Sequence, residues 1–114
     1  MGQHLKQGID LFESGAYFRA HEEFEALWLA SQGPARRLYQ GLVQAAAGLL
    51  KSERGEPVGA GRLLRRALAN IEQAVAEGAR SPAGIDLPRF IIGLRSAAGA
   101  VERGEPVVAP RIRR

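Results

Sequence analysis

Apolar residues recur at helical spacing along most of the chain, and this pattern predicts five helices and no strand. In the first helix Leu5, Ile9 and Phe12 share one face, and Ser14-Gly15 should end it because glycine readily takes the left-handed C-terminal conformation. The second helix follows directly. It carries two neighbouring stripes, so we expect other helices to enclose most of it. The stripes are Tyr17, Ala20, Phe24 and Leu27, and beside them Phe18, His21, Glu25 and Trp28.

The third and fourth helices each begin at a proline, which a first helical turn tolerates well. We expect one helix from Gly33-Pro34 to about Arg54, and the next from Pro57 to Gly78. The third helix has an apolar face and, beside it, a face of polar and small residues that another backbone can approach closely. These faces are Leu38, Leu42, Ala45 and Leu49, and Arg37, Gln40, Gly41, Gln44 and Gly48. The fourth helix should bury Leu63, Leu64, Ala67, Leu68, Ile71 and Val75.

Asp86 is a suitable N-cap for a fifth helix that should run to about Val101. The hexapeptide ERGEPV occurs at 53–58 and again at 102–107, and we interpret both copies as helix stops. Residues 14–30 are similar to half of a tetratricopeptide repeat. The sequence therefore predicts one all-α domain over residues 1–106, a bundle of about five helices in antiparallel hairpins that is tetratricopeptide-like in part. Residues 107–114 predict a basic, flexible tail.

Composition narrows the functional classes. Hydrophobic residues make up 46% of the chain and charged residues 25%, values typical of a soluble globular protein. No stretch approaches a membrane span or a signal peptide, so we expect no membrane partner and a cytoplasmic location. The net charge of +4 comes from scattered arginines with few aromatic residues, which argues against nucleic acid as a partner. Without cysteine, any metal must be held by His, carboxylate or other oxygen ligands.

One helical stripe of the chain contains polar groups where apolar residues are expected. His21 and Glu25 stand one turn apart, in line with Trp28. A buried carboxylate needs a partner, a metal ion or a water-filled pocket. We therefore expect a polar cleft between the second and third helices, lined by His21, Glu25, Trp28, Arg37, Gln40 and Gln44.

The segment AHEEFEALW at 20–28, followed by YQGLVQAAAGLLKSERGEPVGAGRLLRRAL at 39–68, resembles a family of small all-helical bacterial and archaeal proteins of unknown function. The family pattern is a His-x-x-x-Glu-x-x-Trp helix, then a Gln-Gly-x-x-Gln helix, a glycine-rich turn and an Arg/Leu-rich helix, and positions 8 to about 76 match it. Some members are labelled predicted metal-dependent hydrolases. The resemblance thus implies a metal site at His21 and Glu25, although Lys51 stands where members often have a second His.

Three interpretations of the His21–Glu25 pair remain open. The pair can be a structural hydrogen bond, completed by Gln40 or Gln44. It can line a pocket for a small molecule or peptide, or it can hold zinc, manganese or magnesium in a hydrolase where Glu25 is catalytic and Glu22 assists. Our leading hypothesis is a non-enzymatic module that binds a protein or small-molecule partner. Small and apolar residues on the third and fifth helices also suggest a homodimer.

Overall fold

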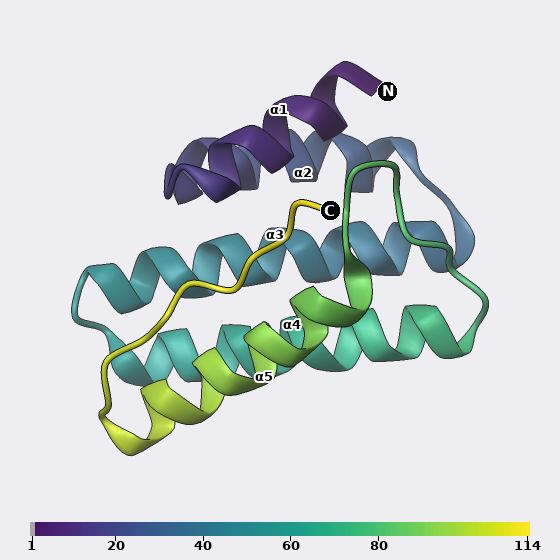
Figure 1. Ribbon diagram of the computed structural model, residues 1–114. Coiled ribbons are helices and arrows are strands. Elements are labelled where there is room, and N and C mark those ends of the chain that lie inside the picture. Colours follow the sequence, from purple (N-terminus) through teal and green to yellow (C-terminus); the bar gives the residue numbers. More distant parts are fainter. Residues whose placement is uncertain (1) are drawn as a thin grey trace.

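The computed structural model describes residues 2–114 and consists of five α-helices joined by short loops (Figure 1). They are α1 (Gly2–Glu13), α2 (Tyr17–Ala30), α3 (Gly33–Glu53), α4 (Pro57–Ala76) and α5 (Leu87–Arg103). Among residues 2–114 the only β-type pairing is an isolated bridge between Ile85 and Arg113. The predicted all-α class and the five helices are confirmed. No helix in the described part of the chain is long and apolar enough to cross a bilayer.

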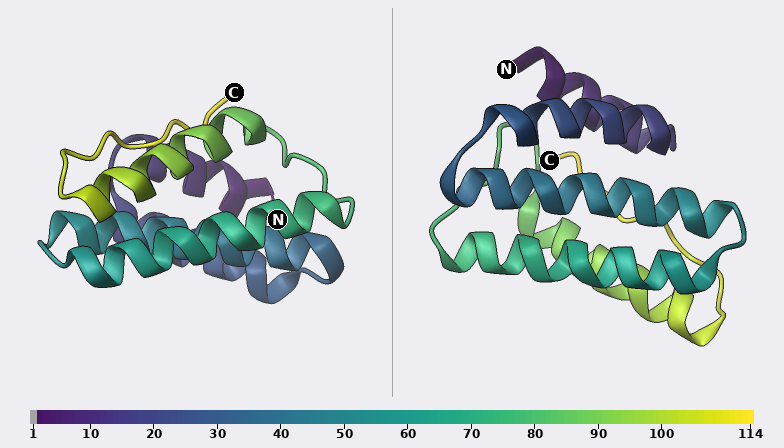
Figure 2. Two further views of the ribbon diagram at one scale, coloured as in Figure 1. Left: turned by 90° about the horizontal axis from the view of Figure 1, so that it is seen from below. Right: turned by 180° about the vertical axis from the view of Figure 1, so that it is seen from behind.

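Each helix packs against the next one along the chain, and consecutive helices run in opposite directions (Figures 1 and 2). The helix α3 lies between α2 and α4, while α5 packs on α4 and crosses it at an angle (Figure 2). At one end of the core, Phe12 contacts three other aromatic rings. Its centroid lies 5.2 Å from that of Tyr17, 6.3 Å from Phe24 and 5.5 Å from Phe90. These contacts join α1 and α2 to α5, which is distant from both in sequence.

The predicted close approach of two helix backbones occurs between α3 and α4. A β-carbon placed on Gly41 would lie 2.5 Å from Ile71 Cγ1 and 3.1 Å from the Ala67 carbonyl oxygen. At Gly48 the nearest atoms belong to Leu64, at 3.0 Å. Glycine is therefore required here by space, since both positions are helical and need no unusual backbone angle. The polar and small face of α3 is the face that α4 covers.

Most predicted core positions are buried or partly buried, and two apolar ones are exposed. Phe18 is 54% exposed and Val75 is 44% exposed. The expectation that neighbours enclose both stripes of α2 is therefore wrong. Helix α2 is buried only along Tyr17, Ala20, Phe24 and Leu27. Phe18 follows Tyr17 by one residue, about 100° around the helix, and this rotation takes it away from the core. Val75 lies in the last turn of α4.

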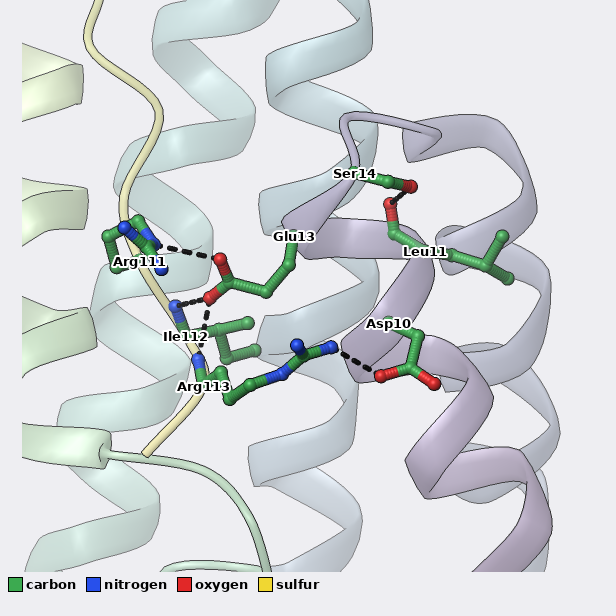
Figure 3. A network of polar contacts seen from close by, with 7 residues as sticks. All are labelled: Asp10, Leu11, Glu13, Ser14, Arg111, Ile112 and Arg113. Atoms are coloured by element: carbon green, nitrogen blue, oxygen red, sulfur yellow. Dashed lines mark hydrogen bonds and ion pairs between the residues drawn. The ribbon is translucent and has the colours of Figure 1, made fainter.

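Residues 107–114, which we call the C-terminal strap, run back along the bundle toward α1 (Figure 1). Ile112 is fully buried, and its carbonyl accepts a hydrogen bond from the Asp86 N–H at 2.9 Å. The Glu13 carboxylate accepts the N–H groups of Ile112 and Arg113 at 2.8 and 2.7 Å (Figure 3). The structure thus differs from the expected flexible tail. One apolar anchor and one carboxylate, 99 positions apart in sequence, hold this segment in place.

We predict that Gly41→Ala lowers the free energy of unfolding by about 1–3 kcal/mol, because the added methyl group must displace Ile71 or the backbone of α4. Gly61→Ala is the matched control, since a β-carbon there would meet its nearest neighbour at 3.7 Å, an ordinary contact. The control should gain about 0.5–1 kcal/mol from helix propensity. Urea denaturation measures both variants. Equal stabilities of the two variants would contradict the steric argument.

The hydrogen bonds between the Glu13 carboxylate and the strap should make the free energy of unfolding depend on pH. Burial by itself raises the pKa of Glu13, but the N–H groups of Arg113 and Ile112 together with the Arg111 guanidinium outweigh burial, so the pKa falls below its ordinary value. A lowered folded-state pKa stabilises the fold above the ordinary value of 4.5, and this contribution disappears as the pH falls through the folded pKa. Urea denaturation between pH 7 and pH 3 should show a steeper loss for wild type than for Glu13→Gln. Parallel curves would contradict this role.

Candidate functional site

The His21–Glu25 pair lies on α2 and is partly open to solvent. His21 Nε2 is 4.0 Å from Glu25 Oε2, which exceeds hydrogen-bonding distance. The His21 side chain is 29% exposed and that of Glu25 is 46% exposed. His21 Nδ1 is buried and has no hydrogen-bond partner among residues 2–114. Because the Glu25 side chain is 46% exposed to solvent, it does not need the buried partner that the sequence pattern led us to expect.

The expected cleft residues of α3, namely Arg37, Gln40 and Gln44, lie on its α4 side. Gln44 Oε1 accepts a hydrogen bond from Asn70 Nδ2 at 2.7 Å, and Arg37 Nη1 donates to Asn70 Oδ1 at 3.4 Å. Arg37 Nε also lies 3.4 Å from Glu77 Oε1. Beside Arg37 and Glu77 lies a polar hollow of about 470 Å³. It is lined by Gly33, Pro34, Arg36, Arg37, Gln40 and Glu77.

The expected single cleft between α2 and α3 is therefore corrected, because its residues fall into two groups. Arg37, Gln40 and Gln44 share the stripe of Gly41, which touches Ile71 of α4. Packing of that stripe on α4 directs these side chains away from α2. No hydrogen bond in residues 2–114 joins His21 or Glu25 to either glutamine.

Trp28 belongs to the junction between α2 and α3. It is partly buried and packs against the hydrophobic core. The Arg36 guanidinium lies 5.5 Å from the centre of its ring, a cation–π contact. Arg36 Nη1 also donates to the Trp28 carbonyl at 3.3 Å. Trp28 thus serves a structural contact, apart from both groups of the expected cleft.

The residues near His21 do not fit a metal site. Structural and catalytic zinc sites need at least three protein ligands. Nowhere in residues 2–114 do three His, Asp or Glu side chains come together in a way that could hold an ion. His4 lies 2.5 Å from Glu23 and is committed to that pair. Glu22 is exposed on α2, and no third ligand completes a set with His21 and Glu25.

A different set of α2 side chains forms a continuous exposed surface. Positions 18, 22, 25 and 29 follow helical spacing and lie opposite the buried face of α2. Phe18 is 54% exposed, Leu29 is 63% exposed, and the two glutamates lie between them. The Phe18 ring centroid is 6.2 Å from that of His21. We call Phe18, Glu22, Glu25 and Leu29 the α2 outer stripe. Leu29 was not among the residues expected from the sequence, and Phe18 was expected in the core, although the spacing of the four residues is visible in the sequence.

Comparison with known proteins places the chain in a family. The family described as "Domain of unknown function (DUF309)" matches residues 5–63, just over half of the chain. The chain belongs to this family. The match runs from α1 to the beginning of α4 and includes the whole α2 outer stripe. The expected membership of a family of unknown function is confirmed, whereas the family description names no metal and no reaction.

A relative from Aquifex aeolicus (strain VF5), described as "Uncharacterized protein", is 28% identical over 103 residues. The aligned region covers 90% of this chain but 30% of the Aquifex protein. The chain therefore spans less than a third of the length of this relative. In the Aquifex protein, the region similar to this chain is one part of a longer polypeptide.

We predict that no metal ion binds in a way that depends on His21 and Glu25. Calorimetric titration of wild type with zinc or manganese ions should give the same heats as titration of His21→Ala/Glu25→Ala, because two ligands whose nearest atoms are 4.0 Å apart leave an ion mainly in water. Both proteins should unfold at similar urea concentrations, since the side chains form no hydrogen bond with each other. Stoichiometric binding that is lost in the double variant would restore the metal site.

Proposed function

We propose that this domain is a non-enzymatic protein-binding module, and that the α2 outer stripe holds a basic amphipathic helix of a partner. The observation that carries this proposal is the arrangement of two exposed apolar side chains around two carboxylates on one helix face. We propose a cytoplasmic setting for this interaction. The alternative of a metal-dependent hydrolase lacks a third ligand among residues 2–114.

The ends of the stripe supply apolar contacts. Phe18 and Leu29 are separated by three helical turns, about 16 Å along the axis. An amphipathic partner helix presents apolar residues at this spacing and can place one against each end. Exposed apolar side chains are common when they occur singly. Here two of them align on the one face of α2 that no other helix covers.

The middle of the stripe supplies the charge. Helix α2 contains three glutamates and one arginine, whereas the whole chain has a net charge of +4. In the described residues neither Glu22 nor Glu25 forms an ion pair with an arginine or lysine. By contrast, Glu13, Glu56, Glu72, Glu77, Glu102 and Glu105 all do. The two stripe carboxylates are therefore available to lysine or arginine side chains of a partner, which favours a basic ligand.

The proportions of the Aquifex protein also support a modular role. The region similar to this chain makes up 30% of that protein, so the remaining length is available for another activity. An interaction domain attached to other domains raises the effective concentration of its ligand. The proposed tetratricopeptide likeness and the proposed homodimer are compatible with such a role.

The test uses two synthetic helical peptides with the same leucine positions, one with lysine and one with glutamate on the flanking positions. We predict that wild type binds the lysine peptide in fluorescence anisotropy, and that Phe18→Ala/Leu29→Ala weakens this binding at least about tenfold, a loss of about 1.4 kcal/mol. Glu22→Lys/Glu25→Lys should prefer the glutamate peptide. Ile92→Ala is the matched control, because Ile92 is 66% exposed on α5, far from the stripe in sequence.

Two results would reject the proposal. One is a wild-type protein that binds neither peptide up to about 1 mM, the weak limit of specific recognition. The other is binding that survives both double variants unchanged. Circular dichroism on each variant checks that the helical fold is retained, as expected for substitutions of exposed side chains.

A further inference from the structure

The C-terminal strap occupies a slot with well-defined chemistry. The slot is formed by Asp10 and Glu13 of α1 (Figure 3), together with the backbone of residues 84–86 and Gly93 of α5. We propose that this slot is a recognition site for an extended Pro-Arg-Ile-Arg segment, and that it accepts this segment from a second copy of the chain as well as from its own. The partner copy would then supply residues 110–113.

The strap is held by two apolar residues. Ile112 is fully buried and belongs to the hydrophobic core. Pro110 is also buried and lies directly on α5, where a β-carbon on Gly93 would come within 2.9 Å of Pro110 Cβ. The slot therefore selects a proline and, two residues later, an aliphatic side chain.

Backbone hydrogen bonds fix the extended conformation between these anchors. The Asp86 N–H donates to the Ile112 carbonyl at 2.9 Å, and the Arg114 N–H donates to the Gly84 carbonyl at 2.8 Å. The strap N–H groups at 112 and 113 donate to Glu13 Oε1 (Figure 3). Such pairing is the mode by which proteins add a peptide strand, with main-chain bonds for affinity and pockets for specificity.

Charge adds selectivity for basic residues beside the aliphatic one. Glu13 Oε2 accepts a hydrogen bond from Arg111 Nε at 2.8 Å, and Asp10 pairs with the Arg113 guanidinium (Figure 3). The Glu13 side chain is only 11% exposed, so its interaction with arginine is less screened than a surface pair. The slot thus complements a segment that alternates basic and apolar residues.

Residues 105–109 connect α5 to Pro110 and form no hydrogen bond with the slot. Glu105, Pro106 and Ala109 are exposed, and Val108 is 81% exposed. Val107 is the one residue between Gly104 and Pro110 that packs on the core. All hydrogen bonds described above therefore form equally well if residues 110–114 arrive from another copy. Exchange of an identical segment between two copies, here residues 110–114, is a low-cost route to dimers.

The repeated hexapeptide does not by itself determine the path of the chain that follows it. Both copies end a helix with a glycine of positive φ, 73° at Gly55 and 69° at Gly104. After the first copy, Pro57 begins α4. After the second, the chain leaves Pro106 in a non-helical conformation and becomes the strap. The same six residues thus precede two different continuations, a helix after the first copy and the extended strap after the second.

The test mixes two full-length variants. Ile112→Asp keeps the slot but loses its own anchor, and Asp10→Lys/Glu13→Lys keeps the strap but repels it from its own slot. We predict that each alone sediments as a monomer at about 100 µM, whereas the mixture forms a 1:1 complex. That concentration lies below the effective concentration of about 1 mM that favours the intramolecular strap. The matched control is the triple variant Asp10→Lys/Glu13→Lys/Ile112→Asp, which should form no complex.

A labelled peptide with the sequence of residues 107–114 provides a second measurement. It should bind Ile112→Asp at least about tenfold more tightly than wild type, because the wild-type strap competes for the slot. A peptide with Asp in place of Ile should not bind. If circular dichroism shows that Ile112→Asp does not fold, Ile112→Ala replaces it in both experiments. Two results overturn the proposal. One is a folded Ile112 variant that binds neither the wild-type peptide nor the Asp10→Lys/Glu13→Lys protein. The other is a folded Ile112 variant that binds the wild-type peptide and the Asp-containing peptide equally well.

Discussion

The backbone of α3 lies so close to α4 that the contact leaves no room for a side chain at Gly41 or Gly48. Most of the remaining structure follows from this approach. It directs the polar stripe of α3 toward Asn70 of α4 and Glu77 directly after α4, which are the partners of Arg37 and Gln44. It also leaves α2 to pack on the opposite side of α3, through one apolar stripe only. The position of the exposed α2 surface is thus a consequence of a contact made by two glycines elsewhere.

The two ends of the described chain are tied together by a single carboxylate. Glu13 ends α1, yet its hydrogen-bond partners are at 111, 112 and 113. Three donors on one carboxylate compensate for the burial of its charge and explain why its pKa is lowered although the side chain is largely covered. Because these donors are mostly backbone groups, the contact depends on the path of the strap more than on its side chains.

The same chain uses its acidic residues in two ways. Asp10 and Glu13 face arginines of the strap and close the fold. Glu22 and Glu25 face solvent between Phe18 and Leu29, and neither pairs with an arginine or lysine among residues 2–114. These two carboxylates, on the surface of a chain with net positive charge, are the basis for proposing a basic partner. Under the proposed function, packing and recognition are therefore separated on neighbouring helices.

The sequence by itself determined the five helices, their approximate ends and most of the core, because helical periodicity, prolines in first turns and glycines at helix ends act within a few residues. It also indicated the close contact at Gly41. Only the tertiary structure decided which neighbour each face meets. The periodicity of α2 shows that Phe18 and Glu25 share a stripe, but exposure depends on how far α1 and α3 wrap around it. The strap is the clearest case, since Ile112 donates its N–H to Glu13, a residue 99 positions away whose contact no local pattern reports.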